Sequence, residues 1–403
     1  MRTPGSSAVP DLVAGLEWTR HDGLDAIRAL RGPWRDVAAA QGESRPYGGP
    51  GFVLAALRAY HGEDRPSVVV VRDGAGWRAV LPLVRRPLVR LGLTVEEYGL
   101  PFNPNTILSD LLIAAGPAAE RRAVAARLID GAFAAGADTV IADNLPAGAG
   151  LPELLREAAA ALGLRSDPVR PARTLHFATL AGDWDGYLAT RSRDHRWRLG
   201  KTRRKAGQVA VERHAGREAI RRQLDIWFAI ERRSWQGAEP AAAMTDRDRA
   251  FHALLLDELA EEELGDLWIV RLGGAPAAAL RMLAAPGRVS VHTMHYDQAY
   301  RAQAPGLIAF EAMMRDACDR GLAEVDMHGN TEFFRRWATG ARAHGSVRLY
   351  RAGPRGALLQ RARQLARAVG GRDRPAADAA PQATLARGMD YGFLRTWRRH
   401  VVI

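Results

Sequence analysis

Apolar and polar positions alternate along the chain in a way that predicts a mixed α/β protein. The clearest signal is a run of four valines at residues 68–71, separated from the apolar segment 77–84 by the turn sequence Asp-Gly-Ala-Gly, which is typical of a β-hairpin. Elsewhere in the first half we expect helices at residues 24–40, from 52 onward, 117–136 and 152–162, and strands at 16–19, 138–145 and 173–177.

The second half repeats this plan. We expect helices at residues 184–206, 217–235, 249–264 and 306–320, and strands at 208–214, in three segments between 266 and 297, and at 323–329. The halves share no obvious sequence repeat, yet two copies of one small α/β fold are the economical prediction. We place the copies at residues 1–170 and 171–352. An Arg- and Ala-rich tail follows at 353–403, where GGRDRPAADAAPQ is predicted to be a mobile linker before a short terminal helix.

The amino-acid composition limits the classes of protein that the chain can belong to. The 403 residues are 47% hydrophobic and 25% charged, which suits two domains with sizeable cores. The formal net charge of +12 comes almost entirely from Arg, as in GC-rich coding, so charge alone does not predict a nucleic-acid surface. The single cysteine, Cys318, excludes an intrachain disulfide and a multi-cysteine zinc site, and we expect a buried thiol and no metal. No apolar segment approaches the roughly 20 residues that span a bilayer, so we expect a cytoplasmic protein.

The most informative segment is a strand at 289–296, followed by a polar loop that ends in Pro305-Gly306 at a helix start. Pro and Gly there should leave the backbone N–H groups of residues 306–309 without intrahelical acceptors. Such a helix start attracts anions, and Arg301 is a nearby cation, so a pyrophosphate is a candidate ligand. An ordinary strand, loop and helix with a solvated end remains the alternative.

Two strings then point to a family. The first is YDQAYRAQAPGL, which starts at residue 296, and the second is GLAEVDMHGNTEFFRRW, which starts at residue 321. Together with the hairpin ending AVLPLVRR and the Arg-rich segment 191–207, these strings resemble the CelD/BcsL-like acetyltransferases. This group is a branch of the GNAT acetyltransferase superfamily and is related to the FemAB transferases. The resemblance covers roughly residues 10–352. It implies a tandem GNAT-like fold whose second copy binds acyl-CoA, most simply acetyl-CoA, while the first copy is non-catalytic and shapes the acceptor cleft.

The resemblance also implies a donor site in the loop and helix start, formed by Arg301, Gln303, Pro305, Gly306 and Leu307. The GNAT phosphate loop usually reads R/Q-x-x-G-x-G/A, whereas this chain reads RAQAPG with Ala304 in the first glycine slot. Because of this departure, an aminoacyl-tRNA donor of the FemAB type stays open as the alternative, and tRNA is the one nucleic acid we consider.

Acyl transfer requires an aligned thioester, removal of a proton from the acceptor and stabilisation of the oxyanion. Asp326 and His328 should alternate onto one face of the strand 323–329, so we take His328 as the candidate general base and Asp326 as the group that orients it or binds the acceptor. His292 and Tyr296 should share a face of the preceding strand, where Tyr296 could protonate the leaving thiolate. Packing roles remain open for all four, and the enzyme could also work by positioning alone.

The acceptor side is less defined. The family typically has Tyr-Lys shortly after the glycine that matches Gly329; here Phe333 and Phe334 take those places, while a following aromatic, Trp337, is kept. The candidate acceptor-binding residues are Phe333, Trp337, Arg203, Arg204 and Lys205. The last three lie in a basic helix that could equally be a solvated face. The resemblance suggests an amine or hydroxyl on a small molecule or polysaccharide precursor, and a non-catalytic basic binding module remains possible.

Overall fold

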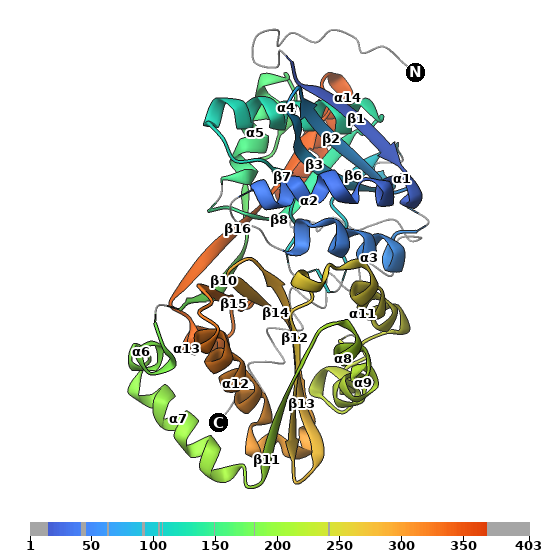
Figure 1. Ribbon diagram of the computed structural model, residues 1–403. Coiled ribbons are helices and arrows are strands. Elements are labelled where there is room, and N and C mark those ends of the chain that lie inside the picture. Colours follow the sequence, from blue (N-terminus) through green and yellow to red (C-terminus); the bar gives the residue numbers. More distant parts are fainter. Residues whose placement is uncertain are drawn as a thin grey trace. The chain divides into compact units, whose positions relative to one another are not determined.

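The computed structural model describes residues 15–41, 46–62, 64–90, 93–103, 105–106, 108–148, 150–180, 182–240 and 242–368. The predicted linker and terminal helix of the tail lie outside this part of the chain. The chain forms two compact units (Figure 1). Unit 2 is Thr174–Arg342, and unit 1 contains the chain up to Arg173 together with the segment that begins at Ala343.

Unit 1 is built on a mixed sheet. Its strand order is β1 (Glu17–Asp22), β2 (Ser67–Asp73), β3 (Gly76–Arg85), β6 (Glu97–Gly99), β8 (Thr139–Pro146) and β16 (Gly340–Tyr350). Neighbours are antiparallel except β6 and β8, which are parallel. Short strands β7 (Leu112–Ile113) and β9 (Arg165–Ser166) pair with β3 and β16, and β4 (Leu88–Arg90) and β5 (Leu93–Val95) form a separate hairpin. The predicted hairpin of β2 and β3 is confirmed.

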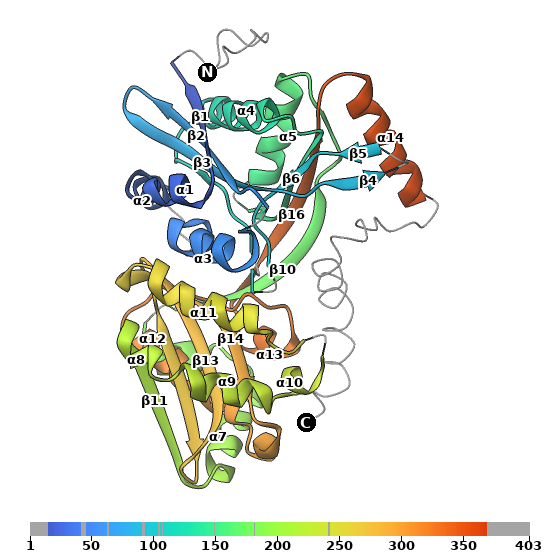
Figure 2. The same cartoon turned by 90° about the vertical axis from the view of Figure 1, so that its right-hand side faces the viewer.

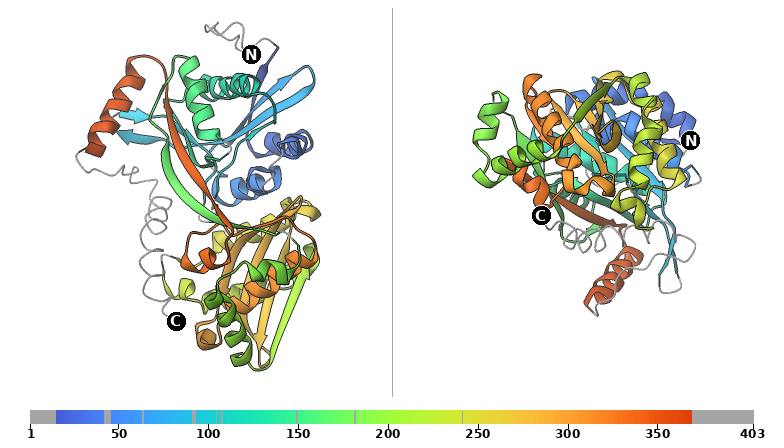
Figure 3. Two further views of the ribbon diagram at one scale, coloured as in Figure 1. Left: turned by 90° about the vertical axis from the view of Figure 1, so that its left-hand side faces the viewer. Right: turned by 90° about the horizontal axis from the view of Figure 1, so that it is seen from below.

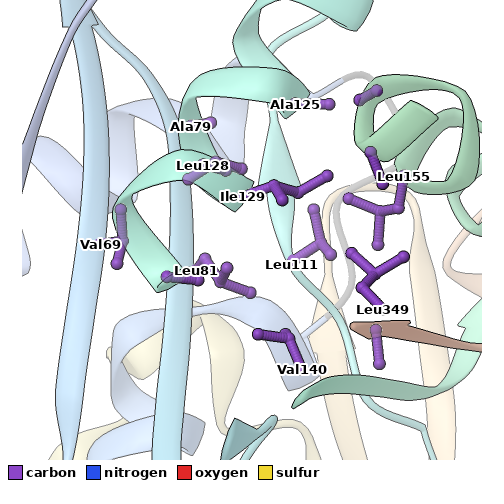
Figure 4. Close-up of a cluster of buried hydrophobic side chains, with 14 of the residues drawn as sticks. Val69, Ala79, Leu81, Leu111, Ala125, Leu128, Ile129, Val140, Leu155 and Leu349 are labelled. Carbon is purple, nitrogen blue, oxygen red and sulfur yellow. The ribbon is translucent and has the colours of Figure 1, made fainter. Parts of the chain in front are cut away.

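Helices cover both faces of this sheet, which explains the unbroken valine run. Val69 and Val71 pack in the core beneath α4 (Ala118–Ala134) and α5 (Leu151–Ala161). Figure 4 shows part of this core, with Val69 labelled. Val68 and Val70 point the other way, into a core formed by α1 (Leu24–Ala29), α2 (Arg31–Ala40) and α3 (Pro50–Tyr60). A strand buried on both faces loses the alternation that marks a half-exposed strand. The unit also contains the 3-10 turn Pro46–Gly48 and α14 (Pro354–Ala368).

The strands of unit 2 also run in mixed directions. Their order is β10 (Arg170–Thr179), β15 (Glu324–Asp326), β14 (Arg288–Tyr296), β13 (Ala275–Ala285), β12 (Asp266–Leu272) and β11 (Val209–Ala215). Only β14 and β15 are parallel. One face is covered by α6 (Trp184–Ala189), α7 (Arg193–Lys205), α12 (Pro305–Asp319) and α13 (Glu332–Trp337), seen from that side in Figure 3. Figure 2 shows the opposite side, with α8 (Arg217–Arg221), α9 (Leu224–Arg232), α10 (Trp235–Ala238) and α11 (Asp246–Glu258).

The strands of the two units share one pairing plan. Each runs through three antiparallel pairs, one parallel pair and a last antiparallel pair. This confirms two copies of one mixed α/β fold. The last strand in each unit comes from an unexpected part of the chain. β10 pairs with β15 of unit 2, and β16, which begins at the end of unit 2, pairs with β8 of unit 1. The segment 343–352, which we expected in the second copy, therefore belongs to unit 1.

Several long helices predicted from periodicity are broken in the structure. The segment 184–206 divides into α6 and α7 because the Ser192 hydroxyl caps a new helix by accepting from the His195 N–H. The segment 217–235 likewise ends early, and Ser234 caps the short α10. Ser at an N-cap satisfies a first-turn N–H group, which favours starting a new helix there.

Candidate active site

The start of α12 is fixed by an unusual N-cap. Ala304 adopts a left-handed conformation, with φ 50° and ψ 53°. Its carbonyl accepts from the N–H groups of Leu307 (3.0 Å) and Ile308 (3.3 Å). Our expectation of free N–H groups throughout the first turn is therefore wrong for these two residues, because the Ala304 carbonyl points along the helix axis. The Gly306 N–H donates to no acceptor in the part of the chain that the structure describes.

Gly306 lies against the end of β14. A Cβ built on Gly306 would be 3.5 Å from Cδ1 of Tyr296 and 3.8 Å from the sulfur of Met294. Of the other predicted donor-site residues, Pro305 is buried and Leu307 half-buried on α12, while Arg301 and Gln303 lie half-buried in the preceding 3-10 turn, Gln298–Gln303. The structure thus brings the helix start and Tyr296 together.

The first turn of α12 suits an anion better than its counterpart in unit 1. It contains no acidic residue. The first turn of α4, which lies in the chain between the parallel strands β6 and β8 as α12 lies between β14 and β15, contains Glu120. The Glu120 carboxylate accepts from Arg78. A carboxylate at a helix start occupies the position that a bound phosphate would need.

A β-bulge in β14 changes which side chains share a face. Arg281 of β13 is opposite Thr293 and Met282 is opposite Val291, so His292 is the extra residue. His292 packs beside Phe251 and His252 on the α11 face, with ring centroids 6.2 and 5.4 Å apart. Tyr296 lies on the other face, beside Gly306. Our expectation of a common face for His292 and Tyr296 is wrong, because the bulge reverses the alternation.

The parallel strands β14 and β15 pair only briefly. Their register runs from Arg288 opposite Glu324 to Ser290 opposite Asp326, where β15 ends while β14 continues to Tyr296. The backbone of β14 beyond Ser290 is thus not bonded to β15 in the register of the described strands. The bulge and Tyr296 lie on this part of β14, and the α12 start lies against Tyr296.

Asp326 and His328 are brought together by a turn and not by strand alternation. β15 ends at Asp326, and His328 has a left-handed backbone with φ 49°. Our expectation that the strand runs through His328 is wrong, but Nε2 of His328 still lies 3.2 Å from Oδ1 of Asp326. The same oxygen accepts the His328 backbone N–H at 3.2 Å. The side chains are 1% and 6% exposed, and Nη1 of Arg342 lies 3.9 Å from the other Asp326 oxygen.

Three further histidines are buried on the α9 and α11 face of the sheet. Burial, with the nearby Arg281 charge, lowers the pKa of His292 to about 3, and burial lowers the pKa of His295 to about 4. The pKa of His252 also falls well below its usual value, again mainly by burial. These imidazoles are neutral at pH 7, which suits a packing role, the alternative left open for His292.

The acceptor-binding candidates fall into two groups. Arg203 forms an ion pair with Glu311 of α12, whereas Arg204 and Lys205 are exposed at the end of α7. Phe333 is half-buried and packs edge-on against Phe310. Trp337 has no exposed surface and packs against the same Phe310 ring, with centroids 5.0 Å apart. Its burial favours a packing role.

The sequence did not point to Arg342 or His252. Arg342 lies on β16 and reaches back to both Glu324 and Asp326, a contact that no local pattern announces. His252 is on α11, where its spacing from the apolar residues Leu255 and Leu256 was the only available signal. No group of three or more His, Cys, Asp or Glu side chains in the described ranges is arranged to hold a metal ion. None of the described helices has the length and hydropathy needed to cross a membrane.

Comparison with known proteins assigns the second unit to a class. Residues 191–337 match the family model of the acetyltransferase (GNAT) domain. This range lies within unit 2 and includes α7, the α12 start and His328. Unit 2 therefore contains a GNAT acetyltransferase domain.

Solved structures extend the fold likeness over most of the chain. The crystal structure of FemX has 12% sequence identity and a TM-score of 0.57, and the alignment covers 88% of this chain and 99% of that one. The C-terminal domain of a putative lysylphosphatidylglycerol synthetase from Agrobacterium fabrum has 12% identity and a TM-score of 0.51, covering 84% and 97%. No curated protein matches the chain significantly. With the repeated strand plan, these likenesses confirm the expected tandem GNAT-like fold.

Proposed function

We propose that unit 2 transfers an acyl group from acyl-CoA to an amine or hydroxyl acceptor. The observation that carries the proposal is the meeting of Gly306, at the start of α12, with Tyr296 and Met294 on β14 beyond the last residue paired to β15. This arrangement puts a helix start, which favours phosphate, beside a strand segment with backbone groups available to a ligand.

In this proposal the pyrophosphate of the donor binds at the α12 start. Gly306 offers a backbone N–H, and its missing side chain lets a phosphate approach the helix. Arg301 supplies a positive charge and Gln303 an amide, both from the half-buried turn before the helix. Pro305 and Leu307 hold the helix start and line the approach.

The chemical step joins the acceptor to the thioester carbon. The acceptor nitrogen or oxygen attacks that carbon, the carbon–sulfur bond breaks, and CoA leaves as a thiolate. His328 removes the acceptor proton, Asp326 orients the imidazole 3.2 Å away, and the Tyr296 hydroxyl protonates the thiolate. A base held by a carboxylate needs no reorientation during the step, which favours catalysis.

On the acceptor side, the exposed cations Arg204 and Lys205 would attract an anionic substrate. Phe333 would contribute an apolar surface. Arg203 acts differently, because its ion pair with Glu311 holds α7 against α12. Unit 1, whose α4 start contains Glu120, serves as the non-catalytic partner.

In its finer form the proposal is a CelD/BcsL-like acetyltransferase that acts in the cytoplasm on polysaccharide precursors. That subtype is supported by the sequence resemblance. A second candidate is transfer from aminoacyl-tRNA. It is favoured by the exposed cations of α7 and by fold likeness to FemX and to a domain of a protein named as a lysylphosphatidylglycerol synthetase.

The donor decides between these candidates. The purified chain is incubated with acetyl-CoA and a panel of amino sugars and simple amines, and the released CoA thiol is measured, with His328→Gln as the matched variant. Acceptor-dependent thiol release that His328→Gln lowers supports the proposal. Transfer from aminoacyl-tRNA alone overturns it in favour of the second candidate. CoA binding without transfer from either donor overturns it in favour of a binding module.

A further inference from the structure

We propose that α7 binds the surface of an anionic phospholipid bilayer through Trp197 and the cationic side chains around it. Trp197 is 55% exposed, the most exposed tryptophan side chain among the large hydrophobic residues of the described chain. An aromatic ring of this size normally packs into a core or an interface. The proposal is independent of the acyl donor.

The helix has two distinct sides. His195 and Leu199 are buried against the core of unit 2, at 2% and 1% exposure. At about 100° per residue, Arg193, Trp197 and Arg204 fall on the opposite side of the helix. Arg193, Trp197 and Arg204 are all exposed, so this side faces solvent in unit 2.

The charge on the outer side is not neutralised within the protein. Arg198 pairs with Asp194, and Arg203 pairs with Glu311. By contrast, four exposed cations have no carboxylate partner in the described part of the chain: Arg193, Arg196, Arg204 and Lys205. The outer side of α7 is therefore a cationic surface with Trp197 at its centre.

Lys201 links the aromatic and the charged groups. Its ammonium lies 4.7 Å from the centroid of the Trp197 ring, within the range of a cation–π contact. The largely exposed indole therefore has a positive charge directly beside it. This combination matches a bilayer interface, where indole sits at the headgroup level and cations bind lipid phosphates.

A bilayer fits better than a nucleic acid. Sites for single-stranded nucleic acid usually stack successive bases on several aromatic side chains. Trp197 is the one exposed aromatic of α7, since the His195 ring packs against Trp337. One indole surrounded by cations suits a planar anionic surface.

The test is cosedimentation of the full chain with vesicles of phosphatidylcholine alone or with about 30% phosphatidylglycerol. We expect binding only to the anionic vesicles and a decrease with salt. Trp197→Ala should lower the partition coefficient at least about threefold, and Arg193→Gln/Arg196→Gln about tenfold. The matched control is Arg222→Gln/Arg232→Gln, which removes the same charge from exposed positions on the α8 and α9 side and should leave binding unchanged.

Three results would overturn the proposal. One is no binding to anionic vesicles. Another is equal binding by Trp197→Ala and the unchanged chain, and the third is an equal loss in the control pair. Binding of a single-stranded RNA oligonucleotide that depends on Trp197, without vesicle binding, would assign the surface to nucleic acid instead. Because Trp197 is largely exposed, circular dichroism melting should show an unchanged fold in Trp197→Ala.

Discussion

The Nε2 atom of His328 lies 3.2 Å from Oδ1 of Asp326, although His328 is outside the strand that contains Asp326. The left-handed backbone of His328 folds the chain back so that its own N–H also reaches that oxygen. One carboxylate oxygen therefore accepts the backbone N–H of His328 and lies beside the Nε2 atom of its ring. The buried imidazole thus lies at the end of β15, next to the carboxylate.

If this pair supplies the base, breaking it should affect turnover more than donor binding. We expect Asp326→Asn to lower kcat by about 10- to 100-fold and His328→Gln by about 100-fold or more, with little change in the KM for acyl-CoA. Steady-state kinetics at saturating acceptor gives both constants. Near-normal kcat in both variants would mean that the enzyme works by positioning alone.

Ala304 holds a backbone conformation that glycine adopts more easily. Ala304→Gly should raise the free energy of unfolding by up to about 1 kcal/mol, since a left-handed conformation costs an L-residue about that amount. Urea unfolding measures the change. Ala302→Gly is the control, because Ala302 is exposed in the same loop and has no positive φ. This substitution should leave the free energy of unfolding unchanged or lower it. Stabilisation by both substitutions would refute the conformational explanation.

The basic residues at the end of α7 should separate by role. Arg204→Gln/Lys205→Gln should raise the KM for an anionic substrate and flatten its salt dependence, with unchanged stability. Arg203→Gln should instead lower stability by less than about 1 kcal/mol, because its half-exposed ion pair with Glu311 is screened by solvent. Kinetics at low and high salt report on substrate attraction by Arg204 and Lys205, and urea unfolding reports on the structural role of Arg203. A KM that is constant across salt in the double variant would make this end of the helix a plain solvated face.

Burial of neutral histidines makes stability depend on pH. In the unfolded chain His295 takes up a proton near its usual pKa of 6.5, but in the folded protein burial lowers that pKa to about 4. Between these values unfolding binds a proton, so stability is complete above pH 6.5 and decreases as the pH falls, by up to about 1.4 kcal/mol per pH unit. His295→Gln should reduce this slope in urea unfolding at several pH values. An unchanged slope would contradict the burial effect.

Local patterns predicted the parts of the fold that depend on neighbouring residues. The hairpin of β2 and β3 follows from apolar runs around a Gly-containing turn, and the α12 start follows from Pro305-Gly306. The break between α6 and α7 was missed because the Ser192 cap lies in a polar stretch that looks like continuous helix.

Long-range contacts decided the rest. β16 pairs with β8 across a large sequence separation, and no signal within residues 340–350 identifies that partner. The bulge at His292 reverses the faces of β14, which strict alternation cannot show. The pair of Asp326 and His328 was chosen for the wrong local reason, since a left-handed turn, and not strand period, brings the two side chains together.

The most direct test of the central claim is calorimetric titration of acetyl-CoA into the purified chain and two matched variants. Gly306→Glu places a carboxylate at the second residue of α12, and Ala119→Glu places one at the second residue of α4, where it is exposed. We predict that the unchanged chain and Ala119→Glu bind with equal affinity, while Gly306→Glu loses at least about tenfold through repulsion of the donor phosphates. Equal affinity in all three proteins, or no binding by the unchanged chain, would contradict a donor site at the α12 start.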